Sequence, residues 1–255
     1  MLVHSPLPLL AVATAAMLFA LPLQKDAAQD PVKTQKVSSL VPVPRTDQWA
    51  IAREKEVLRR ARDTAPVSIV FVGDSITQAW EDAGSEFWKL HFDSIGALNL
   101  GNSGDRTEHV LYRLEQAPLT RLAPKHVVLM IGTNNLGHGK SNAEQTLAGV
   151  KAVITTLQAQ CKEATVHVLE IFPRGDAMNP MRGDIAQINQ ALRAFVRERN
   201  ENAKTDQQPL RIHAVGDLFV DANGAISKDV MPDSLHLSKD GYRIWGEALL
   251  PLVMQ

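Results

Sequence analysis

Short runs of apolar residues alternate with longer amphipathic segments along most of the 255-residue chain. The apolar runs have the length and composition of β-strands and fall at residues 68–72, 97–100, 127–131, 165–171 and 210–215. The amphipathic segments carry apolar residues at helical spacing and fall at 47–62, 75–80, 107–116, 142–161, 182–199 and 238–253. Strands that alternate with helices in this way predict an α/β fold with a mostly parallel, five-stranded sheet.

Two of the apolar runs are nearly continuous, KHVVLMIG at 125–132 and VHVLEIF at 166–172. Strands that helices cover on both faces need such runs, because neither face meets water. In open α/β sheets, ligands bind beyond the carboxyl ends of the strands. A functional site is therefore expected in the loops that follow the strands, at 73–75, 101–106, 132–135 and 172–175.

The N-terminal segment differs in character from the rest of the chain. Residues 7–23 are almost wholly apolar and uncharged, which is typical of the h-region of a signal peptide. We expect residues 1–28 to be a signal peptide that directs the protein to the periplasm or the exterior. A retained membrane anchor is the alternative, because the run approaches the length that spans a bilayer. Prolines and polar residues predict a linker at 29–46, followed by one domain at 47–255.

Composition and charge exclude several classes of partner. The chain is 45% hydrophobic and 22% charged, as soluble globular proteins are. Its net charge of -1 offers no basic surface for nucleic acid, so none is expected as a partner. The single cysteine, Cys161, cannot form an internal disulfide and is interpreted as a structural thiol at a helix end. The sequence contains no CxxC motif or His-Cys cluster that would predict a metal site.

The expected loops contain residues suited to acyl transfer. Ser75 follows the first strand in the sequence GDS, and further on PDSLHLS places Asp233 three residues before His236. A serine hydroxyl needs a base within hydrogen-bond reach, and the base needs a carboxylate that fixes its tautomer. We therefore predict Ser75, Asp233 and His236 as catalytic residues. Backbone N–H groups of Ser75 and Gly104 and the side-chain amide of Asn134 are the predicted oxyanion hole.

These segments carry a resemblance to a known family. The ordered set GDS, GNSGD, GTNN and DSLH resembles the four sequence blocks of the SGNH (GDSL) hydrolase superfamily. Longer stretches, among them ALNLGNSGDRTEHVLYRL and IFPRGDAMNPMRGDIAQINQALR, resemble the catalytic subunits of platelet-activating-factor acetylhydrolases and their bacterial relatives. The similarity extends from about residue 67 to the C-terminus.

The resemblance implies a three-layer α/β/α sandwich of flavodoxin-like type, with no metal or organic cofactor. It implies the roles already given for the serine, aspartate and histidine, and it makes a homodimer an expectation. One position departs from the pattern, because many members have Asp where this chain has Asn135. The acetylhydrolase-like members also accept Asn there.

The hypothesis that follows is a serine esterase for short-chain, chiefly acetyl, esters, with an acetylated sugar or a lipid-like ester as substrate. A non-catalytic carbohydrate- or partner-binding module on the same fold is the alternative, because fold does not fix function. Each residue also has a structural reading: Ser75 is a good helix N-cap, and Asn134 a good turn residue. Arg174 and Arg182 are either a positive rim near the site or solvated arginines.

Overall fold

The computed structural model describes residues 1, 38–64, 66–203 and 209–254. The signal peptide or anchor expected at 1–28 lies outside these residues, apart from Met1. No helix within the described ranges combines the length and the apolar character that a membrane span requires.

Five parallel strands form one sheet in the order β2-β1-β3-β4-β5. The strands are β1 (Ile69–Gly73), β2 (Ala97–Asn99), β3 (His126–Met130), β4 (Thr165–Leu169) and β5 (Leu210–His213). All five lie within two residues of the ranges predicted from the apolar runs. This strand order is the flavodoxin-like one, in which ligands bind where the winding reverses, beyond the ends of β1 and β3.

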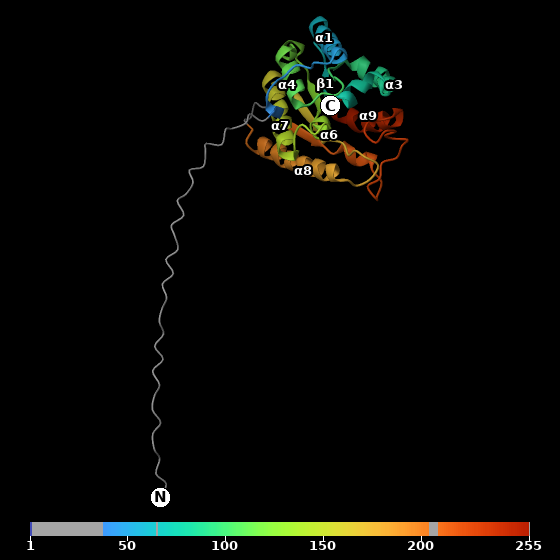
Figure 1. Ribbon diagram of the computed structural model, residues 1–255. Helices are drawn as coiled ribbons and strands as arrows, with labels where there is room; N and C mark the ends of the chain where they lie inside the picture. The colour runs from blue at the N-terminus through green and yellow to red at the C-terminus, as the bar shows by residue number, and fades with distance from the viewer. Residues whose placement is uncertain (2–37, 65, 204–208, 255) are drawn as a thin grey trace. The chain divides into compact units, whose positions relative to one another are not determined.

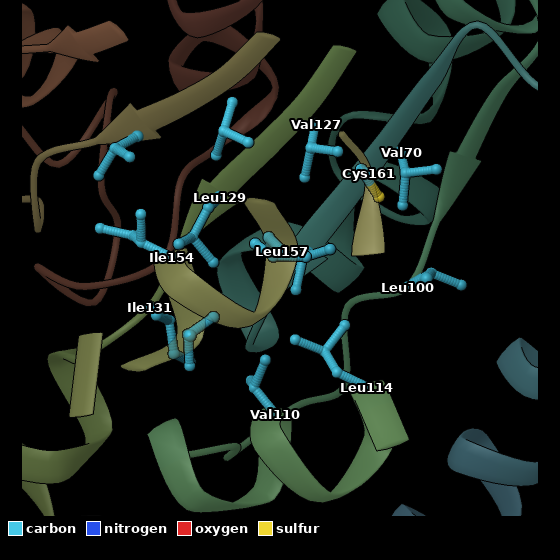
Figure 2. Close-up of a cluster of buried hydrophobic side chains, with 14 of the residues drawn as sticks. Val70, Leu100, Val110, Leu114, Val127, Leu129, Ile131, Ile154, Leu157 and Cys161 are labelled. Atoms are coloured by element: carbon cyan, nitrogen blue, oxygen red, sulfur yellow. The ribbon is translucent and has the colours of Figure 1, made fainter. Parts of the chain in front are cut away.

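Alternate residues of each strand face two separate hydrophobic cores, because successive side chains point to opposite faces of a sheet. Val70 and Val72 belong to the first core, whereas Ile69 and Phe71 belong to the second. Figure 2 shows part of the first core, with the labelled side chains Val70, Leu100, Val110, Leu114, Val127, Leu129, Ile131, Ile154, Leu157 and Cys161. Burial raises the pKa of the Cys161 thiol to about 11, which agrees with a structural thiol.

Helices cover both faces of the sheet. The first core is covered by α1 (Gln48–Asp63), α4 (Thr107–Gln116), α5 (Leu119–Leu122), α7 (Ala143–Gln160) and α8 (Pro180–Glu201). The second is covered by α2 (Ser75–Gln78), α9 (Lys239–Val253) and short helical turns between them. In Figure 1, α4 and α7 lie on one side of β1, and α3 (Ser85–Phe87) and α9 lie on the other. The predicted three-layer α/β/α sandwich is confirmed.

Several short elements have no counterpart in the predicted pattern. They are α3 (Ser85–Phe87), the π-helical turn η3 (Trp88–Phe92), η4 (Asp93–Ile95), α6 (Thr133–Gly137) and η5 (Val215–Phe219). The helix predicted at 75–80 is α2 continued by the 3₁₀ turn η2 (Ala79–Glu81). Aromatic packing stabilises η2 and η3. Their Trp80, Trp88 and Phe92 rings surround Phe71 of β1, with ring centroids 5.0–6.2 Å from that of Phe71. Elements this short carry no helical period, so periodicity could not find them.

Residues 38–46, the last part of the segment expected to be a linker, pack against the domain. The 3₁₀ turn η1 (Ser38–Leu40) buries Ser39, whose hydroxyl donates to the Gln145 carbonyl at 2.6 Å. The Ser39 carbonyl in turn accepts from the Thr107 hydroxyl at 3.0 Å. The structure thus adds this segment to the folded unit that begins, by sequence pattern, at Asp47.

Candidate active site

The turn from β1 into α2 holds Ser75 in a fixed, half-buried position. Gly73 ends the strand, and a Cβ there would lie 2.4 Å from the Met130 carbonyl oxygen, so only glycine fits this close approach of β1 and β3. Asp74 caps the helix, because its Oδ1 accepts a hydrogen bond from the Ile76 N–H at 3.0 Å. The hydroxyl of Ser75 is thereby presented at the first residue of α2.

A second segment brings an imidazole to this hydroxyl. The Nε2 atom of His236 lies 2.9 Å from Oγ of Ser75, although 161 residues separate them in the chain. The Nδ1 atom of His236 lies 2.6 Å from Oδ2 of Asp233. A proton on Nδ1 is therefore donated to the carboxylate, which leaves Nε2 as the acceptor that faces the serine.

A tight turn holds the aspartate and the histidine in register. The Oδ1 atom of Asp233 accepts from the backbone N–H groups of Leu235 at 3.0 Å and His236 at 2.7 Å. Ser234 adopts a φ of 60°, and its carbonyl accepts from the Gly175 N–H at 2.8 Å. Partial burial raises the pKa of Asp233, but hydrogen bonds from the His236 ring and the two N–H groups outweigh it, and the net shift is downward. Asp233 is therefore ionised at neutral pH.

The residues predicted as an oxyanion hole come from the two neighbouring loops. Gly104 has a φ of 73°, and a Cβ there would lie 3.2 Å from the Arg45 guanidinium, so both conformation and space favour glycine. Within the described residues, the backbone N–H groups of Ser75 and Gly104 donate no hydrogen bond. The amide of Asn134 donates one hydrogen bond to the Asp105 carbonyl at 3.0 Å and keeps its second N–H. These three donors are thus left without a partner among the described residues.

A buried ion pair holds the Gly104 loop. Asp105 is fully buried and pairs with Arg113, which is 1% exposed, and with Arg45 at 3.0 Å. Arg113 also donates to the Gly73 carbonyl at 3.2 Å. These contacts connect the loop after β2 to the end of β1, and so fix Gly104 relative to Ser75.

Asn135, the position that departs from the family pattern, is structural in its contacts. Its Oδ1 accepts from the backbone N–H of Thr107 at 3.0 Å, and its amide donates to the Thr107 hydroxyl and to Glu108. The side chain is fully buried and satisfies the first turn of α4. An Asp here would face the carboxylate of Glu108, so Asn suits this neighbourhood.

Asp74 is a buried carboxyl group directly beside the candidate nucleophile. Burial raises its pKa to about 7, against the lowering effect of the Ile76 N–H. Its Oδ2 has no hydrogen-bond partner among the described residues. Since its contact is with the helix N-terminus and not with Ser75 or His236, the geometry gives it a role in holding the turn.

Comparison with known proteins gives the family. The family model of the GDSL-like lipase/acylhydrolases matches residues 71–244, which include all five residues predicted for the site. The chain is a GDSL-like lipase/acylhydrolase. It is 37% identical over 195 residues to the platelet-activating factor acetylhydrolase IB subunit alpha1 of Homo sapiens, covering 76% of this chain and 78% of that protein. The chain is therefore a carboxylic ester hydrolase of this family.

Solved structures share the fold at lower identity. A GDSL-like lipase from Bacteroides thetaiotaomicron has a TM-score of 0.64 at 20% identity, covering 80% of this chain and 98% of that one. The acetyl xylan esterase AlAXEase has a TM-score of 0.57 at 22% identity, covering 73% of this chain and all (100%) of that one. The SGNH fold predicted from the sequence blocks is confirmed by these likenesses.

Two features of this acylhydrolase site were missed in the sequence. The Tyr242 hydroxyl donates to the Ile76 carbonyl at 2.6 Å, which ties α9 to α2. Arg113 supports the Gly104 loop from α4, eight residues beyond Asp105. The tyrosine sits in the DGY sequence that continues the last block, and that placement was the one available signal. The described residues contain no group of three or more His, Cys, Asp or Glu side chains placed to hold a metal ion.

Proposed function

We propose that this acylhydrolase is a serine esterase in which Ser75 is the nucleophile, His236 the general base and Asp233 the residue that orients it. The observation that carries the proposal is the continuous contact from Ser75 Oγ to His236 Nε2 at 2.9 Å and from His236 Nδ1 to Asp233 Oδ2 at 2.6 Å. Oγ attacks the ester carbonyl carbon while Nε2 takes the hydroxyl proton. The imidazolium that forms carries a positive charge, and the Asp233 carboxylate at Nδ1 stabilises it.

The tetrahedral oxyanion then accepts hydrogen bonds from the N–H groups of Ser75 and Gly104 and from the amide of Asn134. Collapse of this intermediate expels the alcohol, which takes the proton from His236 and leaves an acyl-serine. Water repeats the sequence: His236 removes its proton, the acid is released and Ser75 regains its hydrogen. No group beyond these five residues is needed to balance the reaction.

A short acyl group, chiefly acetyl, fits the loops around the site. Only a few residues separate the strands from the next helices: β2 ends at Asn99 and α4 begins at Thr107, while β3 ends at Met130 and α6 begins at Thr133. These connections have no room for an apolar lid over a long chain. The names of the relatives, an acetylhydrolase subunit and an acetyl xylan esterase, support the same preference.

The test is the variant Ser75→Ala, assayed on a panel of 4-nitrophenyl esters from acetate to decanoate and labelled with a fluorophosphonate probe. Wild type should label and should hydrolyse acetate faster than longer esters. The variant should lose labelling and turnover while its thermal unfolding stays unchanged. Turnover within a few-fold of wild type would overturn the assignment of Ser75, and absence of labelling in wild type would favour the non-catalytic binding module.

We also propose that residues 1–28 carry the enzyme out of the cytoplasm, on the ground of their uncharged apolar run. Fractionation of cells that express the full chain, followed by N-terminal sequencing, tests this proposal. A soluble periplasmic or secreted product that starts near residue 29 would support it. An intact chain in the membrane fraction would support the anchor instead, and an intact soluble cytoplasmic chain would overturn both.

A further inference from the structure

Arg174 lies beside the residues of the proposed site and is not used by the mechanism. It belongs to the loop after β4, and its Nη1 donates to the carbonyl and the hydroxyl of Thr133 at 3.3 and 3.2 Å. A Cβ on Gly137 would lie 2.4 Å from the same nitrogen. The guanidinium therefore rests across α6, the helix that carries Asn134.

The other arginines around the site are all neutralised or fully engaged. Arg45 pairs with Asp47 and Asp105, and Arg106 pairs with Glu108 at 2.5 Å. Arg182 uses its nitrogens on three backbone carbonyls, those of Arg174, Gly175 and Gly224. These contacts account for their charges or their donors in structural terms.

Arg174 differs from all three. Within the described ranges it has no carboxylate at ion-pair distance, and its Nε and Nη2 atoms donate no hydrogen bond. Its contact with Thr133 uses one nitrogen of a group that carries five N–H donors. A role limited to bracing α6 therefore leaves most of the guanidinium unexplained.

The charge of Arg174 faces the site. The side chain is half-buried, and this burial lowers its pKa, while the charges of Asp74 and Asp233 act to raise it. Asp74 precedes Ser75 in the chain, and Asp233 contacts the His236 ring that faces Ser75. The guanidinium is therefore within electrostatic range of two carboxyl groups of the proposed site. Removing a cation from water without a partner costs free energy, and that cost is recovered when an anion binds.

We propose that Arg174 binds an anionic group of the substrate, a carboxylate or a phosphate, so that the enzyme prefers esters that carry negative charge near the scissile bond. This inference rests on the proposed function and gives it a substrate class. Unlike a lysine, the guanidinium fork can bind either anion with two parallel hydrogen bonds. Its contact is with Thr133, the residue before Asn134, so the anion would bind near one of the proposed oxyanion donors.

The experiment compares aryl acetates whose second ring substituent is neutral or anionic, and differences in intrinsic reactivity cancel when the same ratio is compared between wild type and variant. Methyl 4-acetoxybenzoate is the neutral substrate, and 4-acetoxybenzoate and 4-acetoxyphenyl phosphate are the anionic ones. The measured quantity is kcat/KM for an anionic ester divided by kcat/KM for the neutral ester. Arg174→Gln should lower this ratio by about 10- to 100-fold, as expected for a lost hydrogen bond to a charged group. Arg174→Lys should keep part of the preference. The anionic ester whose ratio falls further in Arg174→Gln carries the group, carboxylate or phosphate, that Arg174 binds better.

Arg106→Gln is the matched control, because it removes the same charge from another strand-end loop, the one after β2, but from an arginine that already has a carboxylate partner. Its ratio should change less than about threefold; an equal fall in both variants would overturn direct binding by Arg174 in favour of a general field. An unchanged ratio in Arg174→Gln would overturn the inference even where the neutral ester is turned over normally. If wild type hydrolyses no ester, the proposed function fails. Anion binding by Arg174 is then tested separately, by calorimetric titration of wild type and Arg174→Gln with 4-hydroxybenzoate and with inorganic phosphate. Equal affinity in wild type and Arg174→Gln sinks the inference, and weaker affinity in the variant supports it.

Discussion

The two halves of the proposed site are built in opposite ways. The half that carries Ser75 and the oxyanion donors rests on buried polar residues: Asp105 is 0%, Arg113 1% and Asn134 6% exposed. The half that carries the base is one surface turn, in which the side chains of His236 and Asp233 are 41% and 55% exposed. The first half draws on three strand ends, whereas the second needs only four consecutive residues.

This difference separates stability from activity. Buried ions and amides that satisfy one another are costly to disturb, because a lost partner leaves a desolvated group unpaired. Exposed pairs contribute little to the free energy of unfolding, since water competes for both partners. Substitutions in the exposed turn should therefore reduce the rate alone, and substitutions in the buried half should also reduce stability.

Asp233→Asn should give the largest effect on rate. The Asn side chain can still accept from the Leu235 and His236 N–H groups, but it disfavours the tautomer with Nε2 free and cannot stabilise the imidazolium. We expect kcat to fall by about 10,000-fold, with a change of less than about 1 kcal/mol in the free energy of unfolding. Ester assays and urea unfolding measure the two quantities. Asp229→Asn, in the same loop, is the control, and near-normal turnover in Asp233→Asn would reduce the pair to a loop anchor.

Arg113→Met should show the opposite pattern. It removes the buried partner of Asp105 and the hydrogen bond to the Gly73 carbonyl, although Arg45 remains. We expect a loss of about 3 kcal/mol in the free energy of unfolding, near the lower end for a broken buried pair. The exposed arginine Arg243, paired with Glu247 one helical turn away, provides the control: Arg243→Met should cost less than about 0.5 kcal/mol. Equal losses would remove the contrast between the two halves.

Asn134→Ala and Asn135→Ala test two neighbours within the buried half. The first should lower kcat about 100- to 1,000-fold with little change in KM, because its amide would bind the oxyanion and not the ground-state carbonyl. The second should destabilise the fold by about 1–3 kcal/mol, since it leaves the buried Thr107 N–H unpaired. Steady-state kinetics of both variants measure kcat and KM, and thermal unfolding measures their stability. A change confined to KM in Asn134→Ala would make that residue a substrate-positioning group.

The two halves also differed in how far the sequence predicted them. The exposed turn is local: Asp233 and His236 are three residues apart, and spacing alone predicted their contact. The positions of Ser75, Gly104 and Asn134 followed from the rule that parallel strands share one edge, which needs only the strands to be found. Buried apolar runs made that step straightforward.

The supports of the buried half could not be predicted because they depend on packing between distant segments. The pairing of Asp105 with Arg113 needs the exact turn into α4, and an arginine in an amphipathic helix gives no sign of being buried. Residues 38–46 read as a linker from their prolines, yet Ser39 is buried against α4 and α7. Such contacts are set by tertiary structure, which overrides local composition.

Asp74→Asn tests how the buried carboxyl group beside Ser75 makes the free energy of unfolding depend on pH. The pKa of Asp74 is raised from 3.8 to about 7 in the folded protein. Between these values the folded state holds a proton that the unfolded state releases, so stability falls as pH rises through this window. Asn removes this dependence while it keeps the helix cap, and the variant should gain on the order of 1–3 kcal/mol relative to wild type between pH 5 and pH 8. Urea unfolding of wild type and variant at pH 5 and pH 8 measures this gain in the free energy of unfolding. A parallel pH dependence in the two proteins would contradict the prediction.

Tyr242→Phe should give the smallest effect, and it tests whether the two halves are coupled. Tyr242 is buried in α9, the helix that follows the exposed turn, and its hydroxyl donates to the Ile76 carbonyl next to Ser75. Loss of this hydrogen bond should cost about 1 kcal/mol in the free energy of unfolding. Because the bond holds α2, which begins at Ser75, against the helix that follows the turn with His236, kcat should also fall several-fold. Tyr112, the second of the two tyrosines, makes no hydroxyl hydrogen bond within the described part of the chain, so Tyr112→Phe is the matched control. A loss of stability in Tyr242→Phe with kcat unchanged would show that the turn positions His236 without help from α9, and that the two halves are mechanically independent.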